Sequence, residues 1–544
     1  MIQAWSADDV RAAEEPLLAA GVPLMQRAAF ALAAVVRRDL ARRRAVAGPD
    51  GELRDGSVRG ARVALLVGAG NNGGDALHAG AFLARRGLAV TAYLAASRVH
   101  EGGLAALDAA GGRVVALTAA DGGAAPQPGA ARRPTVGVTT AAAAASGADV
   151  IIDGLLGIGA QGPMRGMGGA LVDELSRILP PPGGTGRPWV VAVDVPSGVG
   201  VDDGTLPGPV LPADRTVTFG AAKPGLLLPP ATHLTGAGAV IDIGLALPPA
   251  ARTGGRPAVV RLEDADVAAA WPVPGPQDHK YTRGVVGVVA GTTTYPGAAV
   301  LTAAAAVRAG AGMVRYQGPD DVARAVVAAR PEVVPADGRV QAWVLGPGLP
   351  ADGVDDGQRG RARAALAAAS GLLAGTQDPV PAVVDAGALA LLDRPCPAWV
   401  VLTPHAGELA ALLVAHGEDV ERVGVEAEPL RWARRAHELT GATVLLKGGA
   451  TVVVGPGVTY AQADAPGWLA TAGAGDVLAG LLGAMLAARS AEVVAHPERA
   501  AAVAAAAALV HGRAAERATP GGPVAALAVA DAIPGVVAGL LAAR

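Results

Sequence analysis

The sequence of 544 residues contains a single cysteine, Cys396. One cysteine cannot form an internal disulfide bond, and it cannot build a zinc site made of several thiolates. The sequence therefore excludes a disulfide-stabilised scaffold, and it fits a reducing compartment.

An excess of basic charge is also missing. The chain has 45 lysines and arginines against 48 aspartates and glutamates, which gives a formal net charge of -3. Proteins that bind nucleic acids usually carry a clear basic excess or a basic stripe. We therefore expect no nucleic-acid partner.

Long apolar runs are absent as well. The most apolar stretches near the C-terminus are rich in alanine and are broken by His511, Asp531 or Pro534, whereas a membrane helix needs about 20 mainly apolar residues. The first ten residues include Asp8 and Asp9, and they lack the basic-then-apolar pattern of a secretory signal. The sequence predicts a cytoplasmic protein without a membrane partner.

The composition is that of a folded protein with two domains. Hydrophobic residues make up 51% of the chain and charged residues 17%, which is typical of globular proteins. A chain of this length exceeds one ordinary core. The sequence becomes rich in proline and glycine after Gly244, so we place one domain at 1–245 and a second at 255–544.

Both halves alternate short apolar segments with helical ones, which predicts α/β domains with parallel sheets. Helices are expected at 6–20 and 23–38, and a loop at 121–147. Strands are expected at 62–67, 87–95, 150–152 and 189–193 in the first half, and at 284–290, 340–345, 382–384, 399–402 and 443–446 in the second. Ligands bind at the carboxyl ends of such strands.

The most distinctive motif of the first half is GAGNNGGD at 68–75, between a predicted strand and a predicted helix. Glycines at a helix N-terminus let the backbone approach a phosphate. Side-chain oxygens within such a loop favour a bound cation as well. Asp153 and Asp194 follow two other strands. Each of these polar residues could instead be a helix cap or a turn former, but three such sites at one sheet edge favour a binding site.

The motifs GxGNNGGD, DxLxGxG and DxPSG, together with LMQRA at 24–28, resemble the NAD(P)HX epimerases, the YjeF N-terminal family. The resemblance implies a Rossmann-like three-layer αβα fold that interconverts the epimers of hydrated NADH and NADPH (NADHX and NADPHX). It also implies a catalytic role for Asp194 and a potassium ion held by Asn72, Asp153 and Ser197. The residues implied to line the hydrated dinucleotide are Asn71, Asn72, Gly73, Gly74, Asp75, Gly157, Ile158, Gly159, Ala160, Gln161, Gly162, Pro163 and Asp194. Ala76 departs from the family's usual glycine.

The second half carries GAGD at 473–476 before an apolar helix. Backbone N–H groups of such a turn can bind a transferring phosphoryl group, and Asp476 can accept a proton from the acceptor hydroxyl. We expect the helix dipole to favour its ionised form. The alternative is that Asp476 only caps the helix.

Together with GPGL at 346–349, TPHAGE at 403–408 and KGGAT at 447–451, this turn resembles the ADP-dependent NAD(P)HX dehydratases, which have a ribokinase-like three-layer αβα fold. The resemblance implies that ADP, with magnesium, phosphorylates the hydroxyl of the hydrated ring, giving AMP, and that phosphate then leaves. It implies nucleotide contacts from Lys447, Gly448, Gly449, Ala450, Thr451 and Gly475, and substrate contacts from Ala298, Gly348, His405 and Asp476. We expect Glu408 to cap a helix. Where the family has DADGL, this chain has DAGAL at 385–389, so Asp385 is given only a supporting role.

Two other interpretations stay open at this stage. The second half could be a vitamin-type kinase of the ribokinase class with a passenger domain before it, and the first half could be a scaffold rather than an enzyme. The sequence does not decide between ADP and ATP, and it leaves open whether the protein is a homo-oligomer.

Overall fold

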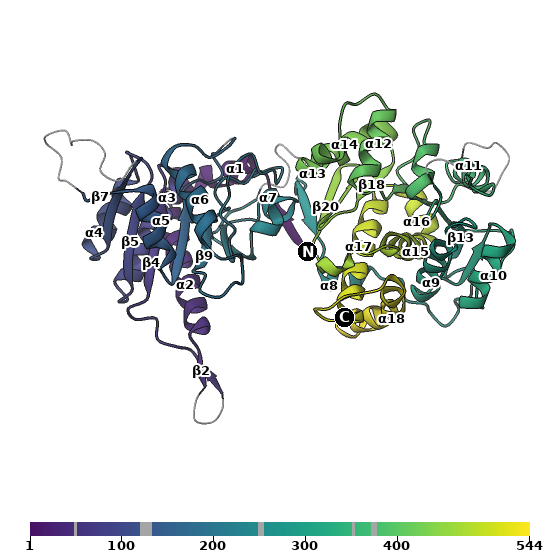
Figure 1. Cartoon of the computed structure of the whole chain (residues 1–544), viewed down its shortest axis with the longest axis horizontal. Helices are drawn as coiled ribbons and strands as arrows, with labels where there is room; N and C mark the ends of the chain where they lie inside the picture. The colour runs from purple at the N-terminus through teal and green to yellow at the C-terminus, as the bar shows by residue number, and fades with distance from the viewer. Residues whose placement is uncertain (48–51, 120–132, 161, 248–254, 351–353, 372–377) are drawn as a thin grey trace. The chain divides into compact units, whose positions relative to one another are not determined.

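The computed structural model describes residues 1–47, 52–119, 133–160, 162–247, 255–350, 354–371 and 378–544. The chain forms two compact units (Figure 1): residues 4–257, and residues 258–544 together with the first three residues. The limits differ from the predicted 1–245 and 255–544 at the very start of the chain. Strand β1 (Ile2–Ala4) lies beside β12 (Val259–Arg261) at the edge of the C-terminal sheet.

The N-terminal unit is built on a sheet of eight strands in the order β11-β10-β9-β8-β4-β5-β6-β7, in which every pair is parallel. The strands are β4 (Arg62–Val67), β5 (Ala89–Leu94), β6 (Arg113–Thr118), β7 (Thr135–Gly137), β8 (Val150–Gly154), β9 (Trp189–Val193), β10 (Arg215–Phe219) and β11 (Ala237–Ile241). A separate hairpin joins β2 (Val46–Ala47) to β3 (Leu53–Arg54).

Helices cover both faces of this sheet. Residues Val63, Leu65 and Val67 of β4 pack in one apolar cluster with helices α2, α3 and α4, whereas Ala64 and Leu66 pack in another with α5 and α6. This alternation along a buried strand confirms the predicted αβα layers. The helices are α1 (Ala7–Ala19), α2 (Leu24–Arg43), α3 (Asn71–Ala84), α4 (Glu101–Ala109), α5 (Val138–Ser146), α6 (Gly166–Ile178) and α7 (Pro224–Leu227).

The predicted loop at 121–147 is wrong in its second part. Strand β7 and helix α5 occupy 135–146. Ala141, Ala142 and Ala145 of α5 are fully buried against the sheet, so the alanine run is a packed helix. Alanine has the highest intrinsic helix propensity, and a buried face of small residues lets the helix lie close to the strands.

The C-terminal unit holds a sheet of ten strands in the order β1-β12-β20-β19-β18-β17-β16-β15-β13-β14. The pairs from β14 to β18 are parallel, and β19 and β20 add antiparallel strands. The strands are β13 (Val285–Val289), β14 (Met313–Tyr316), β15 (Ala342–Leu345), β16 (Ala382–Val384), β17 (Val400–Leu402), β18 (Thr443–Leu446), β19 (Thr451–Gly455) and β20 (Val458–Gln462).

Two layers of helices cover this sheet, which confirms the predicted second αβα domain. Helices α9, α15, α17 and α18 form one large apolar cluster with the strands, and α11, α12 and α14 belong to the other layer. The helices are α8 (Asp264–Ala270), α9 (Pro296–Arg308), α10 (Asp320–Ala329), α11 (Gln358–Ala369), α12 (Ala406–Ala415), α13 (Arg422–Ala427), α14 (Pro429–Thr440), α15 (Ala474–Ala487), α16 (Ser490–Ala495), α17 (Arg499–Ala518) and α18 (Ala526–Ala542).

Among the described residues, no single helix is both long and apolar enough to cross a membrane, although the bent pair of α1 and α2 reaches that length and composition together.

Candidate active sites

The first candidate site lies at the carboxyl ends of the neighbouring strands β4, β8, β9 and β10. The GAGNNGGD segment follows β4, and α3 begins at Asn71. A Cβ atom on Gly73 would lie 2.3 Å from the Gly68 carbonyl oxygen, so this turn excludes any larger residue. The parallel order of the strands brings the end of β4 beside Asp153 in β8.

Asn72, Asp153 and Ser197 meet around the backbone of Leu156. The Asn72 amide nitrogen donates to the carbonyl oxygens of Leu156 at 2.9 Å and Val193 at 2.6 Å. The Ser197 hydroxyl accepts from the Leu156 N–H at 2.9 Å and donates to Asp153 Oδ1 at 2.6 Å, and the Ser197 N–H donates to Asp153 Oδ2 at 2.9 Å. The structure therefore brings together the three oxygen-bearing residues that the sequence singled out.

Asp153 is a completely buried carboxyl group. Burial raises its pKa, while hydrogen bonds from Ser197 and Leu155 favour the ionised form. No lysine or arginine in the described part of the chain forms an ion pair with it or adds to this balance. The carboxyl group thus lacks a cationic protein partner at a place where an unpaired charge is costly.

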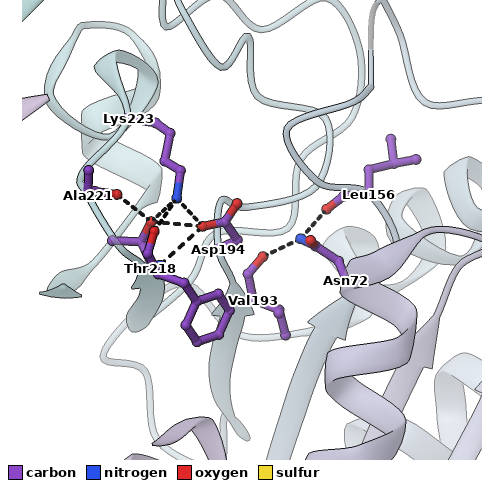
Figure 2. Close-up of polar contacts among 8 residues, drawn as sticks. Asn72, Leu156, Val193, Asp194, Thr218, Ala221 and Lys223 are labelled. Atoms are coloured by element: carbon purple, nitrogen blue, oxygen red, sulfur yellow. Dashed lines mark hydrogen bonds and ion pairs between the residues drawn. The ribbon is translucent and has the colours of Figure 1, made fainter. Parts of the chain in front are cut away.

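Asp194 follows β9 and lies at the centre of a second polar cluster (Figure 2). Its backbone is left-handed, with φ of 67°. The Oδ1 atom accepts hydrogen bonds from Thr218 Oγ1 at 2.9 Å and from the Phe219 N–H at 3.3 Å, and it forms an ion pair with Lys223. Lys223 precedes α7 and is 1% exposed. Sequence reasoning missed Lys223, because a single lysine in a loop carries no signal of its own.

Asp75, in the first turn of α3, has a different environment. It is buried, and its Oδ1 atom has no hydrogen-bond partner within the described residues. Burial, followed by the negative charges of Asp194 and Glu14, raises the pKa of Asp75 well above its usual range, and Lys223 opposes this only in part. Asp75 and Asp194 are therefore two carboxyl groups with contrasting partners.

The other predicted residues of this site lie in the segments that follow β4 and β8. A Cβ atom on Gly157 would lie 2.3 Å from the Asn72 amide oxygen, so Gly157 allows this side chain its place. Asn71, Gly159, Gly162 and Pro163 are exposed, Gly73 and Gly74 are buried, Ile158 and Ala160 are partly buried, and Gln161 lies outside the described residues. Ala76 packs against Gly154, where a Cβ atom would come within 2.7 Å of its methyl group, so the departure from glycine is accommodated locally.

The second candidate site lies at the carboxyl ends of β16, β17 and β18. Asp385, Thr403 and Lys447 follow these three neighbouring strands. Lys447 Nζ lies 2.8 Å from Asp385 Oδ1 and 3.8 Å from Glu408 Oε2, and the Thr403 hydroxyl donates to Asp385 Oδ1 at 2.8 Å. Burial alone lowers the pKa of Lys447, but Asp385 and Glu408 outweigh it, and the pKa is raised.

Asp476 faces this cluster from the first turn of α15. The turn before it has Gly473 in the left-handed region, and a Cβ atom on Gly475 would lie 3.2 Å from Lys447 Nζ. Burial first, and then the charges of Asp385 and Glu408, raise the pKa of Asp476 to about 7, against the effect of Lys447. Burial therefore opposes the helix dipole, and the ionised form is less favoured than the position at the helix N-terminus alone predicts.

His511, from α17, lies beneath the same turn. Its ring forms a hydrogen bond with the Ala474 backbone, and burial lowers its pKa to about 4. Its Nε2 atom has no partner in the part of the chain that the structure describes. Sequence reasoning missed this residue, since α17 approaches α15 only after folding.

The remaining predicted residues of the second half take places around this cluster. The His405 ring accepts from the N–H groups of Gly407 and Glu408, at 3.1 Å and 3.2 Å, and Glu408 accepts from the His405 N–H at 2.9 Å. These two residues thus cap α12, as expected for Glu408. A Cβ atom on Gly348 would lie 2.5 Å from the methyl carbon of Ala298. Gly448, Gly449 and Ala450 form the turn from β18 to Thr451 of β19.

Two protein families match the two halves of the chain. The family described as YjeF-related protein N-terminus matches residues 21–225, and the NAD(P)H-hydrate dehydratase family matches residues 286–534. The bifunctional NAD(P)H-hydrate repair enzyme of Mycobacterium tuberculosis is 41% identical over 500 residues, which cover 89% of this chain and 89% of that protein.

Two further relatives each match one half. The NAD(P)H-hydrate epimerase of Clavibacter michiganensis is 43% identical over 243 residues, which cover 44% of this chain and 90% of that protein. The crystal structure of the ADP/ATP-dependent NAD(P)H-hydrate dehydratase of Bacillus subtilis, co-crystallised with ATP and Mg²⁺, has a TM-score of 0.43 and 25% identity, covering 52% of this chain and 98% of that one.

Proposed function

The chain belongs to the family of bifunctional NAD(P)H-hydrate repair enzymes, and from this we infer that it returns hydrated NADH and NADPH to use. The N-terminal unit epimerises NADHX and NADPHX. The C-terminal unit dehydrates the S epimer to NAD(P)H at the expense of ADP, giving AMP and phosphate. The observation that carries this proposal is that each unit has its own cluster of buried charged groups at the strand ends, within the segments that match the two enzyme families.

We propose a potassium ion at Asn72, Asp153 and Ser197. Hard cations prefer oxygen ligands, and these residues supply an amide oxygen, a carboxylate and a hydroxyl around one backbone segment. Asp153 is fully buried without an ion pair to a described lysine or arginine, so a cation would supply the missing positive charge. When bound, the ion would neutralise Asp153 and hold the loops after β4, β8 and β9 together.

The arrangement of the second site suits phosphoryl transfer to a hydroxyl group. The backbone N–H groups of 473–475 face an incoming phosphoryl group, and Lys447 supplies positive charge beside them. Asp476 can take the proton of the ring hydroxyl while the oxygen of that hydroxyl attacks the terminal phosphoryl group of ADP. The C–O bond then breaks, and phosphate leaves with its electron pair. The neighbouring carbon loses a proton, so the C=C bond of the dihydronicotinamide ring is restored.

Magnesium would accompany the phosphates of ADP. The described residues contain no cluster of three His, Cys, Asp or Glu side chains able to hold a metal. Magnesium usually keeps several water ligands and binds through phosphates and one or two carboxylates. We therefore assign the ion to the phosphates of the nucleotide.

One assay tests the whole proposal. The protein is incubated with hydrated NADH and magnesium together with ADP or with ATP, and the return of NADH absorbance is followed beside the release of phosphate. We expect NADH and free phosphate in equal amounts. A stable phosphorylated product without NADH would instead favour the vitamin-type kinase.

The potassium proposal has its own test. Asp153→Ala should weaken both epimerisation and its response to potassium, while dehydration of the S epimer stays at the wild-type rate. The rate of R-epimer consumption is measured over a potassium titration, with sodium chloride keeping the ionic strength constant. Unchanged epimerisation in the variant, together with no potassium response in the wild type, would contradict the assignment.

A further inference from the structure

The two carboxylate oxygens of Asp194 differ in their hydrogen-bond partners (Figure 2). Oδ1 receives three contacts, from Thr218, Phe219 and Lys223. No described residue forms a hydrogen bond with Oδ2. One oxygen thus anchors the carboxylate, and the other is left as an acceptor for something that is not part of the protein.

The side chain of Lys223 is fixed by hydrogen bonds as well. Its ammonium group has three N–H donors, and it has three acceptors: Asp194 Oδ1, the Thr218 hydroxyl at 2.9 Å and the Phe219 carbonyl at 3.0 Å. A buried lysine whose three donors are all used is fixed in its orientation. The left-handed backbone of Asp194 is unfavourable for a residue with a side chain, so the surrounding contacts must enforce it.

Asp75 has the opposite setting. It is buried like Asp194, but no described side chain donates to it, and its Oδ1 atom has no partner. The negative charges of Asp194 and Glu14 act on it, and among the described residues the charge of Lys223 opposes them. Such contrasting surroundings are typical of two carboxyl groups that serve as a base and an acid.

We propose that Asp194 is the base and Asp75 the acid of the epimerisation, and that Lys223 is the positioning residue that holds the carboxylate of Asp194 in place. This inference rests on the proposed epimerase function and deepens it.

The chemistry of the substrate fits such a pair. Adding water to the enamine of a dihydronicotinamide places the hydroxyl group on the carbon beside the ring nitrogen. Asp194 Oδ2 takes the hydroxyl proton, the C–O bond becomes a carbonyl, the C–N bond breaks, and the nitrogen receives the proton of Asp75. After rotation about the adjacent C–C bond, the same two proton transfers run in reverse and close the ring with the other configuration. Atoms and electrons balance without a redox partner.

Lys223→Met tests the positioning role, because methionine keeps much of the length of the side chain without its charge. A buried carboxylate that has lost its counter-charge takes up a proton more readily. The acid limb of the epimerase pH–rate profile should therefore move to higher pH by about one unit or more, with much of the rate recovered on the alkaline side. Thr218→Val, which removes one hydrogen bond to Asp194, should give a smaller shift in the same direction.

Asp75→Asn tests the acid. The amide keeps the shape of the side chain but cannot give up a proton, so epimerisation should fall by about 10² to 10⁴ while the response to potassium stays.

The full chain is its own control in these measurements. Dehydration of the pure S epimer should run at the wild-type rate in all three variants, which shows that the C-terminal unit is intact, and thermal unfolding like that of the wild type shows that the N-terminal unit is folded. A uniform loss of epimerisation at every pH in Lys223→Met and Thr218→Val, or near-normal turnover of Asp75→Asn, would overturn this inference. A wild-type protein that does not consume the R epimer would overturn the proposed epimerase function as well.

Discussion

Three ionisable groups compete at the dehydratase site, and their balance sets the charge of Asp476. Burial and the carboxylates of Asp385 and Glu408 favour its protonated form, whereas Lys447 favours the ionised form. The result is a pKa of about 7. A general base works best when its pKa lies near the pH at which the enzyme operates, so the group is suited to accept a proton at neutral pH.

This balance predicts the pH dependence of dehydration. Below a pH of about 7 Asp476 takes up a proton and can no longer act as a base. As the pH is lowered below this value, the rate should fall, and the fall should approach about tenfold for each further pH unit. Above neutrality the rate should level off. The measurement is the rate of NADH return from the S epimer at saturating ADP, between about pH 5 and 9. An acid limb near pH 4, the ordinary range of a carboxyl group, would contradict the assignment.

Removing the carboxylate is the complementary test. Asp476→Asn keeps the size of the side chain but cannot accept the proton, so turnover should drop by about 10² to 10⁴. ADP affinity should change little, because nucleotide contacts are assigned to backbone groups and to residues 447–451. Turnover and ADP affinity are measured side by side. Near-normal turnover would show that Asp476 only caps the helix, and lost ADP binding in a folded protein would place it in the nucleotide site.

At the scale of elements, the position of Asp476 depends on how closely α15 packs on α9. A Cβ atom on Gly480 of α15 would lie 2.1 Å from the Thr302 carbonyl oxygen of α9. The glycine therefore allows the two helices their close approach. Gly360 in α11 is also helical, but a Cβ atom there would meet nothing within 4 Å.

These two glycines predict opposite effects of the same substitution. Gly480→Ala should lower the free energy of unfolding by about 1 to 3 kcal/mol, because the added methyl group overpacks the contact. Gly360→Ala should raise it by about 0.4 to 1 kcal/mol, because alanine restricts the unfolded chain without a clash. Urea unfolding of both variants checks this. Equal effects of the two substitutions would show that the interface between α9 and α15 is not tightly packed.

Elements with continuous apolar sequences could be predicted accurately. The strands predicted at 62–67, 189–193, 382–384 and 443–446 have these same bounds in the structure, because buried parallel strands are nearly continuous apolar runs, here rich in valine and leucine. The strands that were not predicted are β1, β2, β3, β6, β7, β10, β11, β12, β14, β19 and β20, and most of them are short or mixed in polarity. The place of β1, for example, depends on pairing with a partner far along the chain.

The same division holds for the candidate sites. Residues in motifs, such as Asn72 and Asp476, could be predicted because the loop chemistry is encoded locally. Lys223 and His511 could not, because their contacts with Asp194 and Ala474 form only when distant elements pack together. The ion pair of Asp385 with Lys447 likewise gives that aspartate a larger electrostatic part than the sequence indicated.

At the scale of the whole molecule, each unit has its own sheet, its own apolar core and its own site. Chains organised in this way usually have units that fold independently. The first residues are the exception, because β1 belongs to the C-terminal sheet, where it lies at the edge next to β12. The cluster of Asp385, Thr403 and Lys447 follows β16 to β18, which are separated from β1 by other strands.

A fragment of residues 258–544 should therefore fold and dehydrate the S epimer with ADP. The melting temperature of the isolated fragment should be lower than that of the C-terminal unit within the full chain, because β1 no longer pairs with the edge of β12. Activity and thermal unfolding of the fragment and the full chain are compared. A fragment that is insoluble while the full chain is soluble would show that the two units depend on a shared core.

The central claim is that one chain carries out both steps, and a mixture of R and S NADHX with ADP and magnesium tests it most directly. The total NADH recovered is measured for the wild type and for Asp194→Asn, with the reaction stopped well before uncatalysed epimerisation is complete. The account predicts that the wild type converts the whole mixture and that the variant stops once the S epimer is consumed. Full conversion by the variant at the wild-type rate would contradict it, and so would a wild type that leaves the R epimer unused.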